Sequence, residues 1–452
     1  MSALGFLFFV VTAIALLSVP RKWALIPFLV GIIFMTHGQR FELGGVGLPI
    51  FRLLLMVGLG RIIMKGEGIE GGANAIDKLL IAFFGWMFFA NFFHESGAED
   101  AGPMFIIGVS AEIGICYLLV RCYCRTLEEF YAILAVLAYL LVPVALEMVQ
   151  EEFTGKNLFS SVFGGVNEMV VMREGELRAR GPFRHAILAG TVGAGLIPLM
   201  FAMWRRNPRA SLTGMAACLT MVIACSSSGP ILSLIFGILG MCLWWFRPWM
   251  GLIRWCIPLG YIFLEIMMKQ PAYYIIAKLS RGGSTGWHRS RLIEAFMKHF
   301  GEWWLVGTDY TRGWMPTGLP GKHQHTDITN YFLAFGVKGG LLAVLLFVAI
   351  IWIAFKWVGD ILNARPDLDP RDRFMIWCMG TSLFTHVASS VSVAYYDQSY
   401  VFFWFSIASI SALAAMIHEP VEEAAEEEAE APAEESSTGN TGGGYTYDMP
   451  RF

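Results

Sequence analysis

Apolar residues form long blocks along most of this chain, separated by short polar stretches. Most blocks are about 17–22 residues long, which is the length that a helix needs to cross the hydrocarbon core of a bilayer. The pattern therefore predicts about 12–13 membrane-spanning helices. The apolar blocks lie at residues 3–19, 23–37, 47–64, 76–93, 104–120, 129–147, 184–203, 210–226, 230–246, 250–268, 327–355, 372–390 and 399–417.

The composition agrees with a membrane protein. Of the 452 residues, 56% are hydrophobic and 15% are charged, whereas about a quarter of a soluble protein is charged. We therefore expect an all-α polytopic membrane protein. The net charge is −3, but glutamates after Pro420 supply much of the negative charge, so the rest of the chain is basic. Residues 418–452 are rich in Glu and Ala and then in Ser, Thr and Gly, which predicts a disordered tail.

Basic residues mark every second short loop, with Arg40 as an exception. Because basic loops stay in the cytoplasm, the pattern predicts a cytoplasmic C-terminus. The long polar loops at residues 148–183 and 269–326 then lie on the extracytoplasmic face, and we expect short amphipathic helices in them. The chain divides into spans at 1–147, a loop at 148–183, spans at 184–268, a loop at 269–326, spans at 327–417 and a tail at 418–452.

The eight cysteines lie within or beside the predicted spans, and neither long loop contains one. This distribution predicts no disulfide framework and no zinc site. We expect no metal ion, no cofactor and no nucleic-acid partner.

The first long loop ends in a cluster of basic residues, Arg178, Arg180, Arg184 and His185, directly before an apolar block. Arginine offers a planar fork that matches phosphate oxygens, and the start of the next helix adds free N–H groups. The cluster therefore predicts an anion site. The alternative is that these side chains extend to lipid headgroups.

The second long loop carries His288-Arg289-Ser290-Arg291, followed by an amphipathic stretch at residues 292–300. Trp303 and Trp304 follow, and such a pair predicts an aromatic anchor at the membrane interface. His323 and His325 come just before the next apolar block. A histidine at the start of a helix can act as a general base, because its pKa lies near neutral pH.

These residues resemble a known family. Arg180-Gly181, Phe183 and His185 are similar to a first-loop motif of the superfamily of O-antigen ligases and O-antigen and exopolysaccharide polymerases. His325-Thr326, nine further residues and then Gly336-Val337-Lys338-Gly339 resemble the signature of the ligases.

Within this resemblance, the second-loop arginine of the family aligns best with Arg289, and Arg291 is the alternative. In place of the Ser-Arg-Gly that many members carry, this chain has Ser226-Ser227-Ser228-Gly229. The resemblance covers residues 175–345 well, and the earlier spans match only in general character.

The resemblance implies a metal-independent, inverting glycosyltransferase of the GT-C type in the bacterial cytoplasmic membrane. Its donor would be a glycan linked through diphosphate to undecaprenol, and its acceptor a growing glycan or lipid A core. Arg180 and Arg289, aided by Arg178 and Arg291, would hold the diphosphate, and His325 would deprotonate the acceptor hydroxyl. Membrane lipids and other polysaccharide-assembly proteins are the further partners that it implies.

Three other residues have two interpretations each. Arg52 lies just inside a predicted span, where it either lines the donor site or extends to the lipid headgroups. Asp327 and Asn330 follow His325 by two and five residues. They either orient the histidine or cap the next helix.

Two other classes of function compete with the enzyme. A transporter of lipid-linked sugars would place charges and broken helices in the middle of the membrane, whereas the candidates here gather in two loops. A scaffold for an envelope complex leaves the arginines and histidines unexplained. Among the enzymes, the polymerase is favoured over the ligase, and a related branch glycosylates protein.

Overall fold

The computed structural model describes residues 2–36, 38–43, 46–94, 103–173, 175–279, 284–316, 318–319, 322–396 and 398–417. The predicted tail at 418–452 lies outside these residues.

The described chain is mostly helical. Each of the thirteen apolar blocks contains an α-helix. These helices are α1 (Ala3–Ser18), α2 (Leu25–Phe34), α3 (Ile50–Lys65), α4 (Ala75–Asn91), α5 (Pro103–Tyr123), α6 (Leu127–Thr154), α8 (Ala186–Ala202), α9 (Pro208–Ala224), α10 (Ser228–Cys242), α11 (Met250–Met267), α15 (Tyr331–Ala364), α16 (Pro370–Ser390) and α17 (Ser399–Leu413).

Six helical segments among the described residues are long and apolar enough to cross a membrane, which agrees with an all-α polytopic protein. The helices α1 and α9 are apolar but shorter. The six segments are Ile106–Tyr123, Leu127–Thr154, Ala186–Arg205, Ser228–Met267, Tyr331–Ala364 and Ser399–Ile417.

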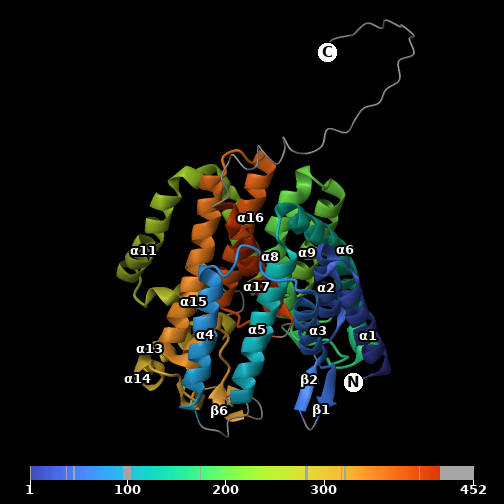
Figure 1. Ribbon diagram of the computed structural model, residues 1–452. Helices are drawn as coiled ribbons and strands as arrows, with labels where there is room; N and C mark the ends of the chain where they lie inside the picture. The colour runs from blue at the N-terminus through green and yellow to red at the C-terminus, as the bar shows by residue number, and fades with distance from the viewer. Residues whose placement is uncertain are drawn as a thin grey trace, which may run out of the picture. The chain divides into compact units, whose positions relative to one another are not determined.

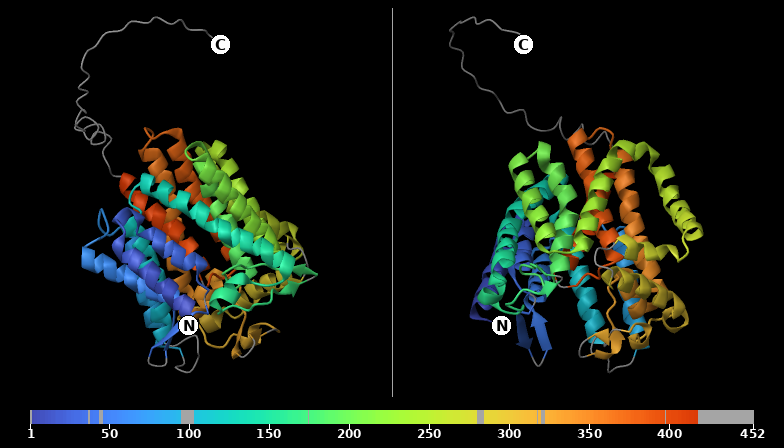
Figure 2. Two further views of the ribbon diagram at one scale, coloured as in Figure 1. Left: turned by 90° about the vertical axis from the view of Figure 1, so that its right-hand side faces the viewer. Right: turned by 180° about the vertical axis from the view of Figure 1, so that it is seen from behind.

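The helices α8 and α17 form the centre of the bundle, because nearly all of their side chains are buried. Helix α8 packs against α9, α10 and α16, while α17 packs against α5 and α16. Helix α4 packs along α15, and α6 along α9. Figures 1 and 2 show these helices side by side, with α11 at the edge of the bundle. None of the side chains of α11 is buried.

Polar residues determine where several helices begin. Asn74 and Asp77 form a reciprocal capping box at the start of α4. Asp369 caps α16, and Pro370 occupies its first position, where a missing N–H costs nothing. The side-chain oxygen of Asn330 accepts hydrogen bonds from the N–H groups of Phe332 and Leu333 and so caps α15.

Several predicted boundaries differ from the structure, and two of the differences have a clear physical reason. Helix α6 continues to Thr154 instead of ending at 147, because Glu147 and Glu151 face the protein and accept hydrogen bonds there. The block at 47–64 begins as a strand, and its helix starts after Pro49. Proline favours an extended residue before it, which explains the delay.

The loops contain short elements. Three antiparallel hairpins pair β1 (Arg40–Leu43) with β2 (Val46–Pro49), β3 (Met172–Arg173) with β4 (Glu176–Leu177), and β5 (Gly318–Leu319) with β6 (Lys322–Thr326). The short helices are α7 (Leu158–Phe163), α12 (Ile275–Leu279), α13 (Ser284–Lys298) and α14 (Phe300–Trp303).

The second polar loop has a small hydrophobic core of its own. Leu292 and Phe296 of α13 are buried, as predicted for the amphipathic stretch, and they pack with Leu333 of α15. The ring of Trp303 stacks on Phe296 at a centroid distance of 3.7 Å, and its indole N–H donates to the Phe296 carbonyl. The prediction of an interfacial anchor is therefore wrong for Trp303, while Trp304 is exposed.

Candidate functional site

Arginines from the two polar loops meet beside the turn between α9 and α10. Arg178 of the first loop lies against this turn, where its Nε donates to the Cys225 carbonyl at 3.5 Å. Arg289 of α13 lies on the same turn, because a Cβ atom built on Gly229 would be 3.8 Å from its guanidinium. Residues about one hundred positions apart in sequence therefore share one site, which we call the arginine site.

Arg289 is a buried cation. Its side chain is 6% exposed, and its Nε has no hydrogen-bond partner among the residues that the structure describes. Burial lowers the pKa of Arg289, and the charges of Arg173 and Arg178 lower it further, although a guanidinium stays protonated in proteins. The described charges that act on Arg289 are cations, and a buried charge without a counter-charge is costly, so this position is suited to an anion.

Ser226 gives the same turn an unusual backbone. Its φ of 42° is the one positive φ of a non-glycine residue among the described residues. Such a conformation costs about 1–3 kcal/mol and clusters at functional sites. The turn lies where the sequence carries Ser226-Ser227-Ser228-Gly229 in place of the Ser-Arg-Gly of the resembling family.

Arg291 is placed differently, although it lies only two residues from Arg289. Its side chain is 49% exposed and forms an ion pair with Glu294 at 2.8 Å. The carboxylate of Glu294 also accepts a hydrogen bond from the Tyr274 hydroxyl. The structure therefore places Arg291 outside the arginine site.

Arg180 is held by the end of α6. Its backbone N–H donates to the Glu151 carboxylate at 2.5 Å, and its guanidinium donates to the carbonyls of Asn167 and Met169. Burial lowers the pKa of Arg180, and the nearby Glu151 and Glu147 oppose this change. Arg180 lines a small polar cavity of about 460 Å³ together with Arg40 and Arg184.

The residues around Arg180 explain the first-loop motif physically. Gly181 has a φ of 59°, a region that glycine enters without steric cost, and a Cβ there would press on Val144. The Phe183 ring is fully buried. Together these two residues fix the path of the chain that carries Arg180 and Arg184.

His185 caps α8, because its Nδ1 accepts a hydrogen bond from the N–H of Ile187. Desolvation by the surrounding protein, aided by the charges of Arg178, Arg180, Arg173 and Arg184, lowers the pKa of His185 to about 4. The imidazole is therefore neutral near pH 7. The sequence-based expectation of a fourth cation at this position is wrong.

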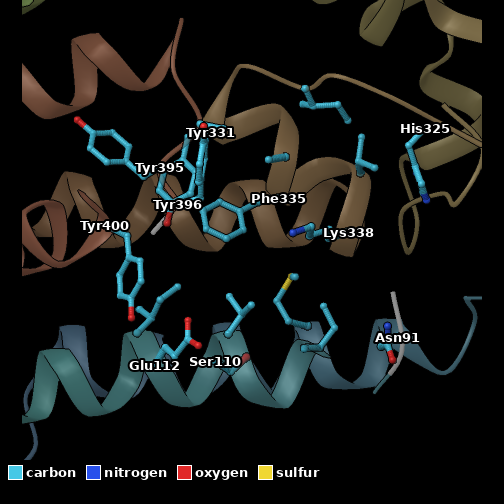
Figure 3. A pocket seen from close by; sticks show the side chains of 18 of the residues that line it. Asn91, Ser110, Glu112, His325, Tyr331, Phe335, Lys338, Tyr395, Tyr396 and Tyr400 are labelled. Carbon is cyan, nitrogen blue, oxygen red and sulfur yellow. The ribbon is translucent and has the colours of Figure 1, made fainter. Parts of the chain in front are cut away.

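A larger cavity of about 670 Å³ contains His325. It lies between α15 and β6 on one side and α4 and α5 on the other (Figure 3). Arg40 and Arg184 line both this cavity and the smaller one, so the two adjoin. We call the larger cavity the histidine cavity. Asp327 lies at its lining and is exposed, whereas Asn330 is the cap of α15.

Aromatic and polar side chains line the histidine cavity, as is common for small-molecule pockets. Figure 3 shows Tyr395, Tyr396 and Tyr400 on one side and Ser110 on the other. Tyrosine offers an apolar face and a polar tip.

The Arg52 guanidinium donates to the Glu112 carboxylate, with an Nε–Oε1 distance of 2.6 Å. Both residues line the histidine cavity. The structure thus places Arg52 in the cavity with His325, and its described contacts are with Glu112 rather than with the arginine site.

His94 and Asp309 also line this cavity and contact each other. The Nδ1 of His94 lies 2.7 Å from the Asp309 carboxylate, and its Nε2 lies 2.9 Å from the Val306 carbonyl. This pair ties the end of α4 to the second polar loop.

Sequence reasoning missed several residues of these sites. In the sequence, Arg40 stood out only as a charged loop residue. No local pattern pointed to Arg173 or to His94. Lys338 also lines the histidine cavity. Its signal was present in the sequence, because a lysine inside a predicted span is rare and usually functional.

Among the described residues, no group of three or more His, Cys, Asp or Glu side chains is placed to hold a metal ion. The chain matches no protein-family model and no curated protein sequence.

Proposed function

We propose that this chain is an integral-membrane glycosyltransferase that uses a glycan linked through diphosphate to a polyprenol such as undecaprenol. The observation that carries the proposal is Arg289, a buried guanidinium whose Nε has no described partner and whose charged neighbours are Arg173 and Arg178. A diphosphate would supply the missing negative charge.

The arginine site would act on the leaving group. As the bond between the anomeric carbon and the phosphate oxygen breaks, its electron pair stays with the lipid diphosphate. Fixed positive donors stabilise such developing charge without reorganising. Arg178 and Arg289 would serve directly, while Arg180 and Arg184 line the smaller cavity, which adjoins the histidine cavity.

His325 would act on the acceptor. The acceptor hydroxyl loses its proton to the imidazole while its oxygen attacks the anomeric carbon from the face opposite the leaving group, so the configuration inverts. A general base contributes about 10²–10⁴-fold to such a step. The histidine cavity adjoins the smaller arginine-lined cavity, which supports a shared reaction centre.

The charge pattern along the sequence supports an extracytoplasmic position for both polar loops and a cytoplasmic C-terminus. The proposal includes 12–13 spans in a GT-C-like arrangement in the bacterial cytoplasmic membrane. A polymerase of exopolysaccharide or O-antigen is favoured, an O-antigen ligase is second, and a protein glycosyltransferase is third.

One observation favours a transporter of lipid-linked sugars as a second candidate. Helix α15 is broken at Gly340, and Arg52, Glu112 and Lys338 face a cavity from predicted spans. Broken helices and buried charges are typical of secondary transporters.

Reconstitution of the purified protein into liposomes with lipid-linked oligosaccharide separates the two candidates. New glycosidic bonds between oligosaccharides, detected by mass spectrometry, would support the enzyme. Exchange of the lipid between leaflets without new bonds would support the transporter and overturn the enzyme. An R289M protein provides the comparison and should form bonds about 10²–10³-fold more slowly.

A further inference from the structure

Helix α15 contains a break whose hydrogen bonds are supplied by other segments. Gly340 has φ 71° and ψ −169°, so the helix is interrupted there. The Val337 carbonyl accepts instead from the Thr308 N–H at 2.8 Å, and the Leu341 N–H donates to the Trp304 carbonyl at 2.8 Å. The Trp86 indole donates to the Gly339 carbonyl at 2.6 Å.

Two glycines allow this exchange of partners. Gly340 and Gly307 both have positive φ, which other residues adopt only with strain. A Cβ atom on Gly340 would overlap the Leu305 carbonyl, and one on Gly307 would overlap the Val337 carbonyl. The break is therefore a specific feature in which residues 304–308 complete the helix.

The break lies just after Lys338, and Lys338 lines the histidine cavity. Figure 3 shows Lys338 on α15, across the cavity from the helix that carries Glu112 and Ser110. Seven residues of α15 precede Lys338, and the helix is apolar and long enough to cross a membrane. A cation at such a position is costly unless it faces a polar cavity or a charged partner.

Cationic side chains outnumber carboxylates in the described lining of this cavity. Four Arg or Lys side chains line it, namely Arg40, Arg52, Arg184 and Lys338, against three carboxylates, namely Glu112, Asp309 and Asp327. An anionic group that enters the cavity would therefore meet a lining that is cationic on balance.

From this geometry we propose that Lys338 contacts an anionic group of the substrate, and that the break at Gly340 exists to present it. The inference rests on the proposed glycosyl transfer and adds a substrate contact separate from the arginine site. The anionic group has two sources, a phosphate of the donor or the carboxylate of an acidic sugar.

The test is equilibrium binding of inorganic pyrophosphate and of glucuronate to the full-length protein in detergent. K338M should lower the affinity for one of the two anions by about tenfold or more, since a hydrogen bond to a charged group is worth about 1.5–3 kcal/mol. K338R should stay close to wild type. Lys356 lies on the same helix, exposed and paired with Asp360 at 3.1 Å, so K356M is the matched control.

The anion whose affinity falls in K338M identifies the source of the anionic group that Lys338 contacts. Wild-type affinity of K338M for both anions would overturn the inference. If R289M loses pyrophosphate binding while K338M binds both anions normally, the inference fails and the proposed function stands. If R289M binds pyrophosphate as wild type does, the proposed function fails, whatever K338M does.

A measurement on the wild-type protein avoids dependence on the folding of K338M. Pyrophosphate or glucuronate should protect Lys338, but not Lys356, against acylation by an amine reagent, followed by mass spectrometry. Equal acylation of Lys338 with and without both anions would contradict the proposal.

Discussion

The arginine site and the histidine cavity hold their charges in different ways. In the arginine site, Arg289 is buried with an unpartnered Nε and has cations as its charged neighbours. In the histidine cavity, Arg52 is bonded to Glu112 and His94 to Asp309. A buried charge without a counter-charge reduces stability, whereas a bonded pair holds structure together. The arginine site therefore has a buried cation with cationic neighbours, whereas the described charges of the histidine cavity are paired in part.

The largest expected effect is that of removing the base from the histidine cavity. H325A should lower transfer by about 10²–10⁴-fold, because the acceptor hydroxyl loses its proton acceptor. The rate is measured with lipid-linked oligosaccharide in liposomes. Normal insertion and a normal thermal transition are the controls. A variant with undiminished yield and chain length would remove His325 from the mechanism.

The next effect compares two arginines of α13. R289M should lower transfer by about 10²–10³-fold, because a fixed donor to the leaving group is lost. R291M is its matched control and should keep nearly full activity, since Arg291 is exposed and paired with Glu294. Equal losses in the two variants would contradict the distinction between a buried anion site and a surface ion pair.

A stability measurement sharpens the comparison between the two regions. E112Q should destabilise the protein by about 1–3 kcal/mol, because it leaves Arg52 without its carboxylate. R289M, in contrast, should leave the thermal transition in detergent unchanged or raise it, because an uncompensated charge disappears. The R52M/E112M double variant should recover part of the loss from E112Q. An R289M protein less stable than E112Q would reverse the comparison.

The smallest effect concerns pH and His185. Its pKa is lowered to about 4 in the folded protein, whereas an unfolded histidine titrates near 6.5. Above pH 6.5 neither state is protonated, so stability does not depend on this residue. As the pH falls from about 6.5 to about 4, only the unfolded state binds the proton, and stability is lost.

H185Q should therefore lose less stability than wild type over that pH window, as measured by thermal unfolding. Its transfer activity between pH 7 and pH 8 should keep the wild-type pH dependence, because the imidazole is neutral throughout. Identical acid sensitivity of the two proteins would show that His185 is not the neutral cap inferred here.

Much of the fold could be predicted from apolar blocks, because a helix satisfies its backbone hydrogen bonds within one segment. Each block contains a helix, yet α2 covers only Leu25–Phe34 and α6 extends to Thr154. These ends depend on distant partners. Glu151, for example, accepts from the backbone of Arg180, a contact that no local pattern encodes.

The candidate site was predicted in part. The residue types in the two loops indicated anion binding, but not whether Arg289 or Arg291 faces inward. Burial on α13 distinguishes them. The separate location of Arg180 in the smaller cavity also depends on packing against α6.

The sequence by itself determined the membrane class, the positions of the helices and the basic chemistry of the two loops. Apolar periodicity and residue type are local properties, and they suffice for these features. Only the tertiary structure decided which cations share a site, which are paired, and that α15 breaks at Gly340. Those properties depend on groups such as Trp304 and Thr308 that replace the hydrogen bonds of α15 from another part of the chain.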